Sequence, residues 1–163
     1  MDCEHDIEEH EYTISGDTAR TVKIRLFWTD EGKDQSTWMK NFLAECICDG
    51  VAVATALARY IYREGMRSEF WERMEEVSWD MCDVAFQVFD RYGTLKPKYK
   101  GHPVQRGTGV WGDELDYGPL FLIEELHVTA VELRRKGLGQ KVVSLLLNKA
   151  KRFCLDDKGN GEY

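Results

Sequence analysis

The sequence predicts an α+β fold, a mostly antiparallel, twisted sheet combined with helices. Three observations lead to this prediction. Apolar and polar residues alternate in several short segments of the first 62 residues, the apolar period changes to three and four after Ser68, and an apolar segment near residue 120 leads through glycines into a second helical stripe. The chain has 163 residues, which is the size of one domain.

Composition is that of a folded globular protein, with 43% apolar and 31% charged residues. The longest uncharged apolar run, 51–58, spans eight residues, far fewer than a membrane span needs. The first twelve residues are acidic and contain no apolar segment typical of a signal peptide. We therefore expect an intracellular protein, cytoplasmic or nuclear, with no membrane partner.

Cysteine usage argues against a disulfide framework, because the count of five is odd and no C-x-x-C pair occurs. Cys46 and Cys48 are two residues apart and share one face of a predicted strand as small buried groups. Cys3, His5 and His10 are too weak a pattern to predict a metal site. We predict free thiols and no metal.

Charge is unevenly distributed along the chain. Residues 1–12 carry six acids and no base, so most of the net charge of −7 lies there. Residues 134–152 contain seven bases and no acid. This asymmetry predicts an anionic ligand near the C-terminal segment. No aromatic-rich basic motif accompanies it, so the signal for nucleic-acid binding is weak.

The first half of the chain predicts two hairpins. Residues 12–15 and 21–28 form strands about a turn at Gly16, with alternating apolar residues in the second strand. The Asp49-Gly50 pair lies between two apolar runs and predicts a tight hairpin turn joining strands at about 40–48 and 51–62. Residues 1–12, by contrast, are expected to form a flexible acidic tail.

A single long helix is expected over about 68–92. Its apolar stripe comprises Phe70, Met74, Val77, Met81, Val84 and Val88, and it ends near Gly93. Trp71, Trp79, Phe86 and Phe89 are expected to widen the buried face. A loop follows at 95–116 and contains the G-x-G-x-x-G pattern of 107–112, which lacks the flanking strand and helix of a dinucleotide site.

Residues 120–153 predict a strand, a basic glycine turn and a helix. The segment 120–129 predicts a central strand, Arg134-Arg135-Lys136-Gly137-Leu138-Gly139 forms the turn, and an apolar stripe continues to Phe153. A helix N-terminus has N–H groups without partners and a positive dipole end, so anions bind there. Glycines that lack a Cβ atom would let a pyrophosphate approach the backbone.

This unit resembles the acetyl-CoA signature of the GNAT family of N-acetyltransferases. Arg134-x-x-Gly137-x-Gly139 is similar to the family pattern R/Q-x-x-G-x-G/A, and 123–128 looks like the fourth strand of that fold. The resemblance implies acetyl-CoA as co-substrate and an amine acceptor that attacks the thioester directly. It implies that Leu126, His127 and Val128 pair with the pantetheine arm, the Val128 amide polarising the thioester carbonyl. It also implies that the pyrophosphate is bound by Arg134, Arg135, Lys136, Gly137, Leu138 and Gly139.

Two carboxylates in this strand are the candidate catalytic residues. Glu124 shares a strand face with Leu126 and Val128 and suits the role of general base. The Glu124-Glu125 pair also looks like the acidic residues that face a cationic amine in the spermidine/spermine acetyltransferases. An acid pair at a cleft rim, or one in a salt bridge, is an equally good interpretation.

The chain departs from the family pattern after residue 153. A fifth strand, a further helix and two more strands would follow in the family, whereas this sequence ends at Tyr163, so the resemblance predicts a C-terminally truncated fold. One domain is expected over 13–155, with a flexible tail at 156–163. An open sheet edge could be completed by a second copy or a partner, which supports the alternative of a non-catalytic interaction module.

Overall fold

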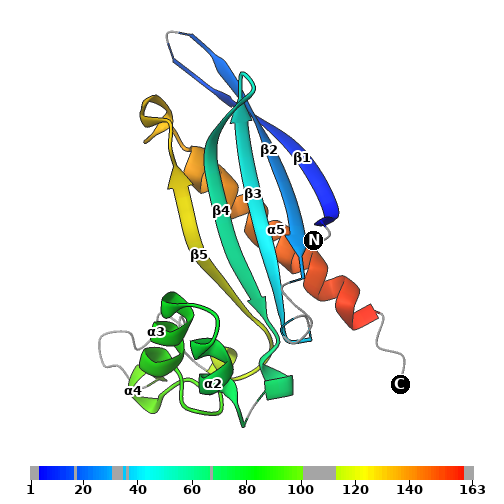
Figure 1. The fold of residues 1–163 in the computed structure, drawn as a ribbon, viewed down its shortest axis with the longest axis vertical. Helices are drawn as coiled ribbons and strands as arrows, with labels where there is room; N and C mark the ends of the chain where they lie inside the picture. Colours follow the sequence, from blue (N-terminus) through cyan, green and yellow to red (C-terminus); the bar gives the residue numbers. More distant parts are fainter. Residues whose placement is uncertain are drawn as a thin grey trace. The chain divides into compact units, whose positions relative to one another are not determined.

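The computed structural model describes residues 4–16, 18–30, 35, 37–66, 68–100 and 113–159. Five strands form one antiparallel sheet in the order β1-β2-β3-β4-β5 (Figure 1). They are β1 (Glu4–Ile14), β2 (Arg20–Thr29), β3 (Met39–Cys48), β4 (Val51–Ile61) and β5 (Leu120–Val128). The helices are α2 (Phe70–Glu75), α3 (Trp79–Val88), α4 (Pro97–Lys100) and α5 (Leu138–Gly159), with 3-10 turns η1 (Arg63–Met66), η2 (Asp113–Asp116) and η3 (Val131–Leu133). The α+β class and the antiparallel sheet are confirmed.

The acidic N-terminal segment is a strand rather than the predicted flexible tail. From Glu4 to Ile14 it pairs with β2, with a register shift between His5 and Glu8. The prediction is wrong because a strand can be stabilised by residues far away in sequence. The ammonium of Lys149 on α5 lies 2.9 Å from a Glu8 carboxylate oxygen and 2.5 Å from one of Asp6.

The second predicted hairpin is confirmed. β3 and β4 are joined at Asp49 and Gly50, whose φ angles of 51° and 77° match the tight turn that a D-G pair favours. Cys46 and Cys48 on β3 are both buried and unpaired, as predicted. Burial raises the pKa of the Cys46 thiol to about 11, so this group is an apolar core residue.

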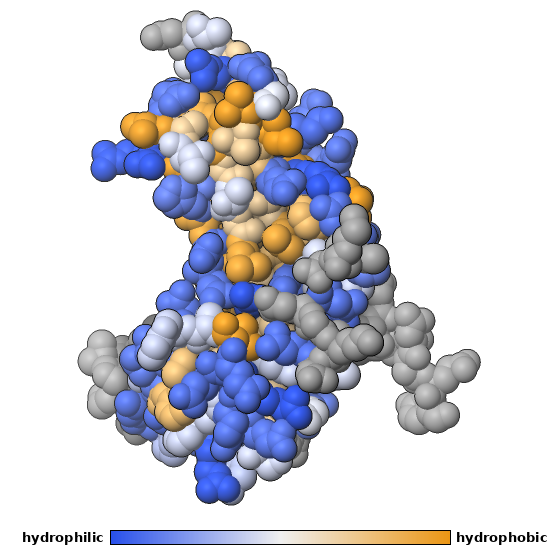
Figure 2. Space-filling view, in the orientation of Figure 1, coloured by the Kyte–Doolittle hydropathy of each residue, from blue (hydrophilic) through white to orange (hydrophobic). Residues whose placement is uncertain are grey.

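Helix α5 covers one face of the sheet and lies behind the strands in Figure 1. The predicted apolar stripe is buried at Leu138, Val142, Leu145, Leu146 and Ala150. Near the end of the stripe, the centroid of the Phe153 ring lies 5.1 Å from that of Tyr60 and 5.3 Å from that of Phe42. The opposite sheet face carries a band of apolar side chains bordered by hydrophilic ones (Figure 2).

The predicted long helix over 68–92 is two short helices, α2 and α3. The side-chain oxygen of Ser78 accepts a hydrogen bond from the Met81 amide at 3.2 Å, so Ser78 caps a new helix. Phe89 is buried as expected, whereas Trp79 is 86% exposed and Phe86 is 37% exposed. The prediction that all four aromatic residues widen the core is therefore wrong for these two.

The chain packs as two compact units. One comprises residues 1–60 and 121–163, with the sheet and α5, and the other comprises residues 61–120, with the short helices. The predicted domain 13–155 thus contains an inserted helical unit between β4 and β5. Helix α5 continues to Gly159, so the segment predicted as a C-terminal tail from residue 156 begins in helical conformation.

Candidate functional site

Strand β5 carries most of the residues singled out from the sequence. It was predicted to be a central strand, but it lies at one end of the strand order. Glu125, Leu126 and His127 are exposed, and Val128 is half-buried. An outer strand presents backbone N–H and C=O groups on its free side, and among the described residues no strand occupies that side of β5.

The basic turn at 134–139 is separated from β5 by five residues that include η3, and its last two residues begin α5. After η3, Arg135 adopts a φ of 59° and Gly137 a φ of 83°, so the chain reverses into the helix at Leu138. The Arg134 Nε atom donates a hydrogen bond to the Val128 carbonyl oxygen at 2.9 Å. The structure therefore brings together the end of β5 and the turn.

Both glycines of the turn are approached by the chain's own side chains. A Cβ atom on Gly137 would lie 2.7 Å from the Tyr12 hydroxyl oxygen, and one on Gly139 would lie 3.3 Å from a Leu126 methyl group. Close packing and the positive φ of Gly137 thus explain the need for glycine there. An anion site at this turn depends instead on the helix N-terminus and the nearby cations.

Five of the seven cations of 134–152 fall into two groups. Arg134, Arg135 and Lys136 are exposed at the N-terminus of α5 and form no ion pair among the described residues. Farther along the helix, near its middle, Lys149 and Arg152 are both bound by Glu8. The predicted cluster of seven bases therefore leaves a smaller positive site, centred on the turn.

Glu8 is stabilised as a carboxylate by these partners. Burial alone raises its pKa, but hydrogen bonds from Lys149, Arg152 and His10 outweigh this effect and lower the pKa to about 2. Lys149 is almost completely buried, with a side-chain exposure of 1%. The acidic first strand thus neutralises two cations near the middle of α5 and does not form ion pairs with Arg135 or Lys136.

A small hollow lies beside the turn. It has a volume of about 190 Å³ and its lining includes Arg20, Glu132 and Lys136, together with Ile14, Gly16, Thr18 and Leu133. The Arg20 guanidinium lies 3.5 Å from a Glu132 carboxylate oxygen. Lys136 is thus the cation of this hollow for which the described residues supply no ion-pair partner.

The two candidate catalytic carboxylates have different environments. Glu124 is buried, with 5% side-chain exposure, and one of its oxygens lies 2.7 Å from the Arg59 Nε atom. Arg59 also donates a hydrogen bond to the side-chain oxygen of Asn41. Glu125 is exposed. The salt-bridge interpretation therefore applies to Glu124, while Glu125 is accessible to a ligand.

Sequence reasoning missed two residues of this region, Tyr12 and Arg59. Tyr12 lies in the segment predicted to contain the first strand, and nothing in its sequence context indicates the distant turn. The sequence does contain an indication of Arg59. It is the single cation of the otherwise apolar strand β4, and Glu124 is an acid within the apolar part of β5. Opposite charges in two apolar strands indicate a buried pair.

The remaining sequence motifs contribute no site within the described part of the chain. The glycine pattern at 107–112 and Cys3 lie outside the described residues. In the part of the chain that the structure describes, no group of three or more His, Cys, Asp or Glu side chains could hold a metal ion. No described helix is both long and apolar enough to cross a membrane.

Similarity to known proteins adds no further site residues. No protein-family model matches the chain, and no curated protein or solved structure is significantly similar to it.

Proposed function

We propose that the chain is an acetyl-CoA-dependent N-acetyltransferase that acts on an amine, with a GNAT-like arrangement of strand, basic turn and helix. The observation that carries the proposal is the exposure of Arg134, Arg135 and Lys136 at the N-terminus of the 22-residue helix α5. Cations and unpaired helical N–H groups together bind phosphates strongly. The pyrophosphate of acetyl-CoA is the ligand that we assign to residues 134–139.

The position of β5 supports the binding of an extended arm beside it. Its outer backbone groups are not covered by a described strand, and the exposed residues Leu126 and His127 lead toward the turn. An amide-containing chain such as pantetheine can pair with a free strand edge in the way that a peptide does. In this proposal the Val128 amide polarises the thioester carbonyl as its oxygen becomes negative.

The chemistry is a direct transfer. The amine nitrogen attacks the acetyl carbonyl carbon, the C–S bond breaks, and the sulfur leaves as thiolate and is protonated to the CoA thiol. The attacking amine must lose a proton, and the exposed Glu125 suits this role or the attraction of a cationic amine. Glu124, which is bound to Arg59, suits a positioning role in the same strand.

The proposal is tested by measuring free CoA formation from acetyl-CoA with a panel of primary amines, polyamines and lysine peptides. Arg135→Asn is the informative variant, because asparagine tolerates the φ of 59° that Arg135 adopts while removing the charge. We expect it to raise the KM for acetyl-CoA about tenfold. Lys151→Gln, which removes an exposed cation elsewhere on α5, serves as the matched control and is expected to behave as wild type. A KM for acetyl-CoA that is equal in the two variants would contradict the proposal.

A second candidate function is a non-catalytic module that binds acetyl-CoA or a partner strand. Two observations favour it: Glu124 forms a buried ion pair, and β5 is an outer strand. The same assay separates the candidates. Binding of acetyl-CoA without CoA release for any amine would support the module and contradict the enzyme.

A further inference from the structure

One face of α3 presents two aromatic side chains to solvent. Trp79 is 86% exposed and Phe86, seven residues later, is 37% exposed. Residues seven apart lie on the same helix face, about 10 Å apart along the axis. Burial of an indole ring is worth a few kcal/mol, so an almost fully exposed tryptophan is an unused source of binding energy.

The Phe86 end of this face is held rigidly. The Trp71 ring stacks on Phe86 with 4.6 Å between ring centroids and an interplanar angle of 22°. The Trp71 indole N–H also donates a hydrogen bond to the Ala85 carbonyl oxygen at 3.1 Å. A partner that packs there meets a surface whose side chains are already ordered, which reduces the entropy lost on binding.

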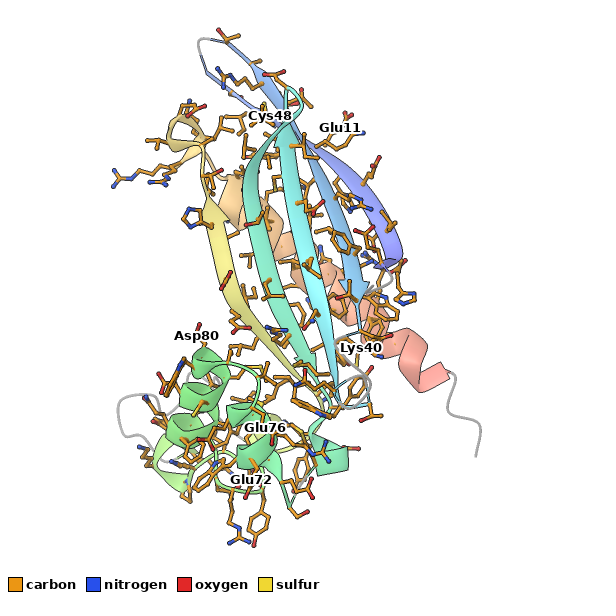
Figure 3. All side chains as sticks on the ribbon, in the orientation of Figure 1. Glu11, Lys40, Cys48, Glu72, Glu76 and Asp80 are labelled. Atoms are coloured by element: carbon orange, nitrogen blue, oxygen red, sulfur yellow. The ribbon has the colours of Figure 1, made fainter. Side chains whose placement is uncertain are left out.

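Unpaired carboxylates are numerous in the segment that carries the aromatic residues. The segment 69–83 contains six acids and one base, and that base, Arg73, is bound to Glu69 at 2.8 Å. The other five acids are exposed and form no ion pair among the described residues: Glu72, Glu75, Glu76, Asp80 and Asp83. Figure 3 labels three of them, Glu72, Glu76 and Asp80, on the α2–α3 segment.

We propose that this acidic aromatic face, defined by Trp79, Phe86 and the five carboxylates, binds a basic amphipathic segment of another polypeptide. Charge complementarity selects Lys and Arg, whose cations pair with the carboxylates and stack over Trp79. An apolar side chain of the same segment packs beside Phe86. The separation of the two aromatic residues suits a peptide of several residues rather than one small ligand. The proposal is independent of acetyl transfer.

The test is fluorescence anisotropy with the full chain and a labelled twelve-residue peptide that alternates Lys or Arg with Leu. A second peptide has Glu in place of each cation, and a third is oligolysine, which lacks the apolar residues. We expect the first peptide to bind more tightly than either of the others at physiological salt. Trp79→Ser should weaken its binding about tenfold, since a central aromatic anchor carries much of the energy of an interface.

Matched control variants distinguish binding at the acidic aromatic face from general electrostatic attraction to the protein. Tyr117→Ser removes another exposed aromatic residue of the same unit, and Glu11→Gln removes an exposed acid of β1; both should bind as wild type does. Glu76→Gln combined with Asp83→Asn should weaken binding and lower its salt dependence. Circular dichroism of each variant checks that α2 and α3 remain folded.

Four results would overturn the proposal. Equal binding by wild type and Trp79→Ser, or equal binding of oligolysine and the amphipathic peptide, would mean that the aromatic residues have no role. Absence of binding by all three peptides would also contradict the proposal. A dimer in sedimentation that Trp79→Ser abolishes, with no peptide bound, would assign this face to a second copy instead.

Discussion

The Tyr12 hydroxyl group donates a hydrogen bond to the Lys136 carbonyl oxygen at 3.1 Å and lies against Gly137, where an added Cβ atom would be 2.7 Å away. This contact joins the first strand to the basic turn across 124 residues of sequence. The hydrogen bond positions the turn through its backbone and does not involve the side chains of Arg134, Arg135 or Lys136. The geometry of the proposed phosphate site therefore depends on an N-terminal strand.

Substitution Gly137→Ala is expected to destabilise the protein by about 2–3 kcal/mol, because both the φ of 83° and the Tyr12 contact oppose a methyl group. Gly50→Ala is the matched control. Gly50 has a φ of 77° but no atom within 4 Å of an added Cβ, so its loss should be only about 1 kcal/mol. Urea denaturation measures both, and equal losses would rule out a role for the Tyr12 contact.

Stability should depend on Glu8 in acid. Its pKa is lowered from 4.5 to about 2, so the charged form is favoured by folding at neutral pH. Solvent screening reduces the stabilisation that this shift implies to about 2 kcal/mol, which is present above about pH 5 and is lost as the pH falls toward 2. The melting temperatures of wild type and Glu8→Gln should therefore differ at pH 7 and become equal as the pH approaches 2.

Glu9→Gln, which replaces an exposed acid of the same strand, should leave this pH profile unchanged. A difference between wild type and Glu8→Gln that stays constant from pH 7 to pH 2 would contradict the role of Glu8.

Arg63 is expected to hold the helical unit together. Its guanidinium donates hydrogen bonds to the carbonyl oxygens of Gly93, Leu115, Tyr117 and Gly118, and the residue is 4% exposed. Arg63→Lys cannot make all four bonds and should cost about 3 kcal/mol in that unit. Hydrogen exchange should show faster exchange within residues 61–100, whereas Arg73→Lys, at an exposed ion pair, should have little effect.

Glu124→Gln should destabilise the sheet by about 2–4 kcal/mol, because it removes the charge of the carboxylate that lies 2.7 Å from the Nε atom of the buried Arg59. Glu125→Gln removes an exposed acid and should change stability by less than about 0.5 kcal/mol. Chemical denaturation of the two variants measures the difference. Equal stability would mean that the Arg59–Glu124 contact has no structural role.

Local signals predicted the parts of the fold that depend on neighbouring residues. The Asp49-Gly50 turn, the strands on either side of it, and the succession of β5, basic turn and α5 were all predicted from sequence. The buried stripe of α5 from Leu138 to Ala150 was also correct. In each case the pattern of a short segment is sufficient, because turn geometry and helical periodicity are local properties.

Long-range contacts account for the errors. The part of β1 before Tyr12 was missed because its acids are stabilised by Lys149 and Arg152, more than 140 residues away. The outer position of β5 depends on strand order, which its own apolar run does not specify. The break at Ser78 did leave a local signal, a capping serine inside the apolar stripe, and the exposed Trp79 lies directly after it.

Thermal unfolding with and without excess acetyl-CoA, and with NAD as a control, tests the central claim most directly. A ligand that binds the folded state raises its apparent stability by about 2.7 kcal/mol at a hundred times its Kd. We predict a rise with acetyl-CoA that NAD does not reproduce and that Arg135→Asn reduces while Lys151→Gln does not. A cooperative transition that acetyl-CoA leaves unchanged would contradict the assignment of the basic turn as a CoA-binding site.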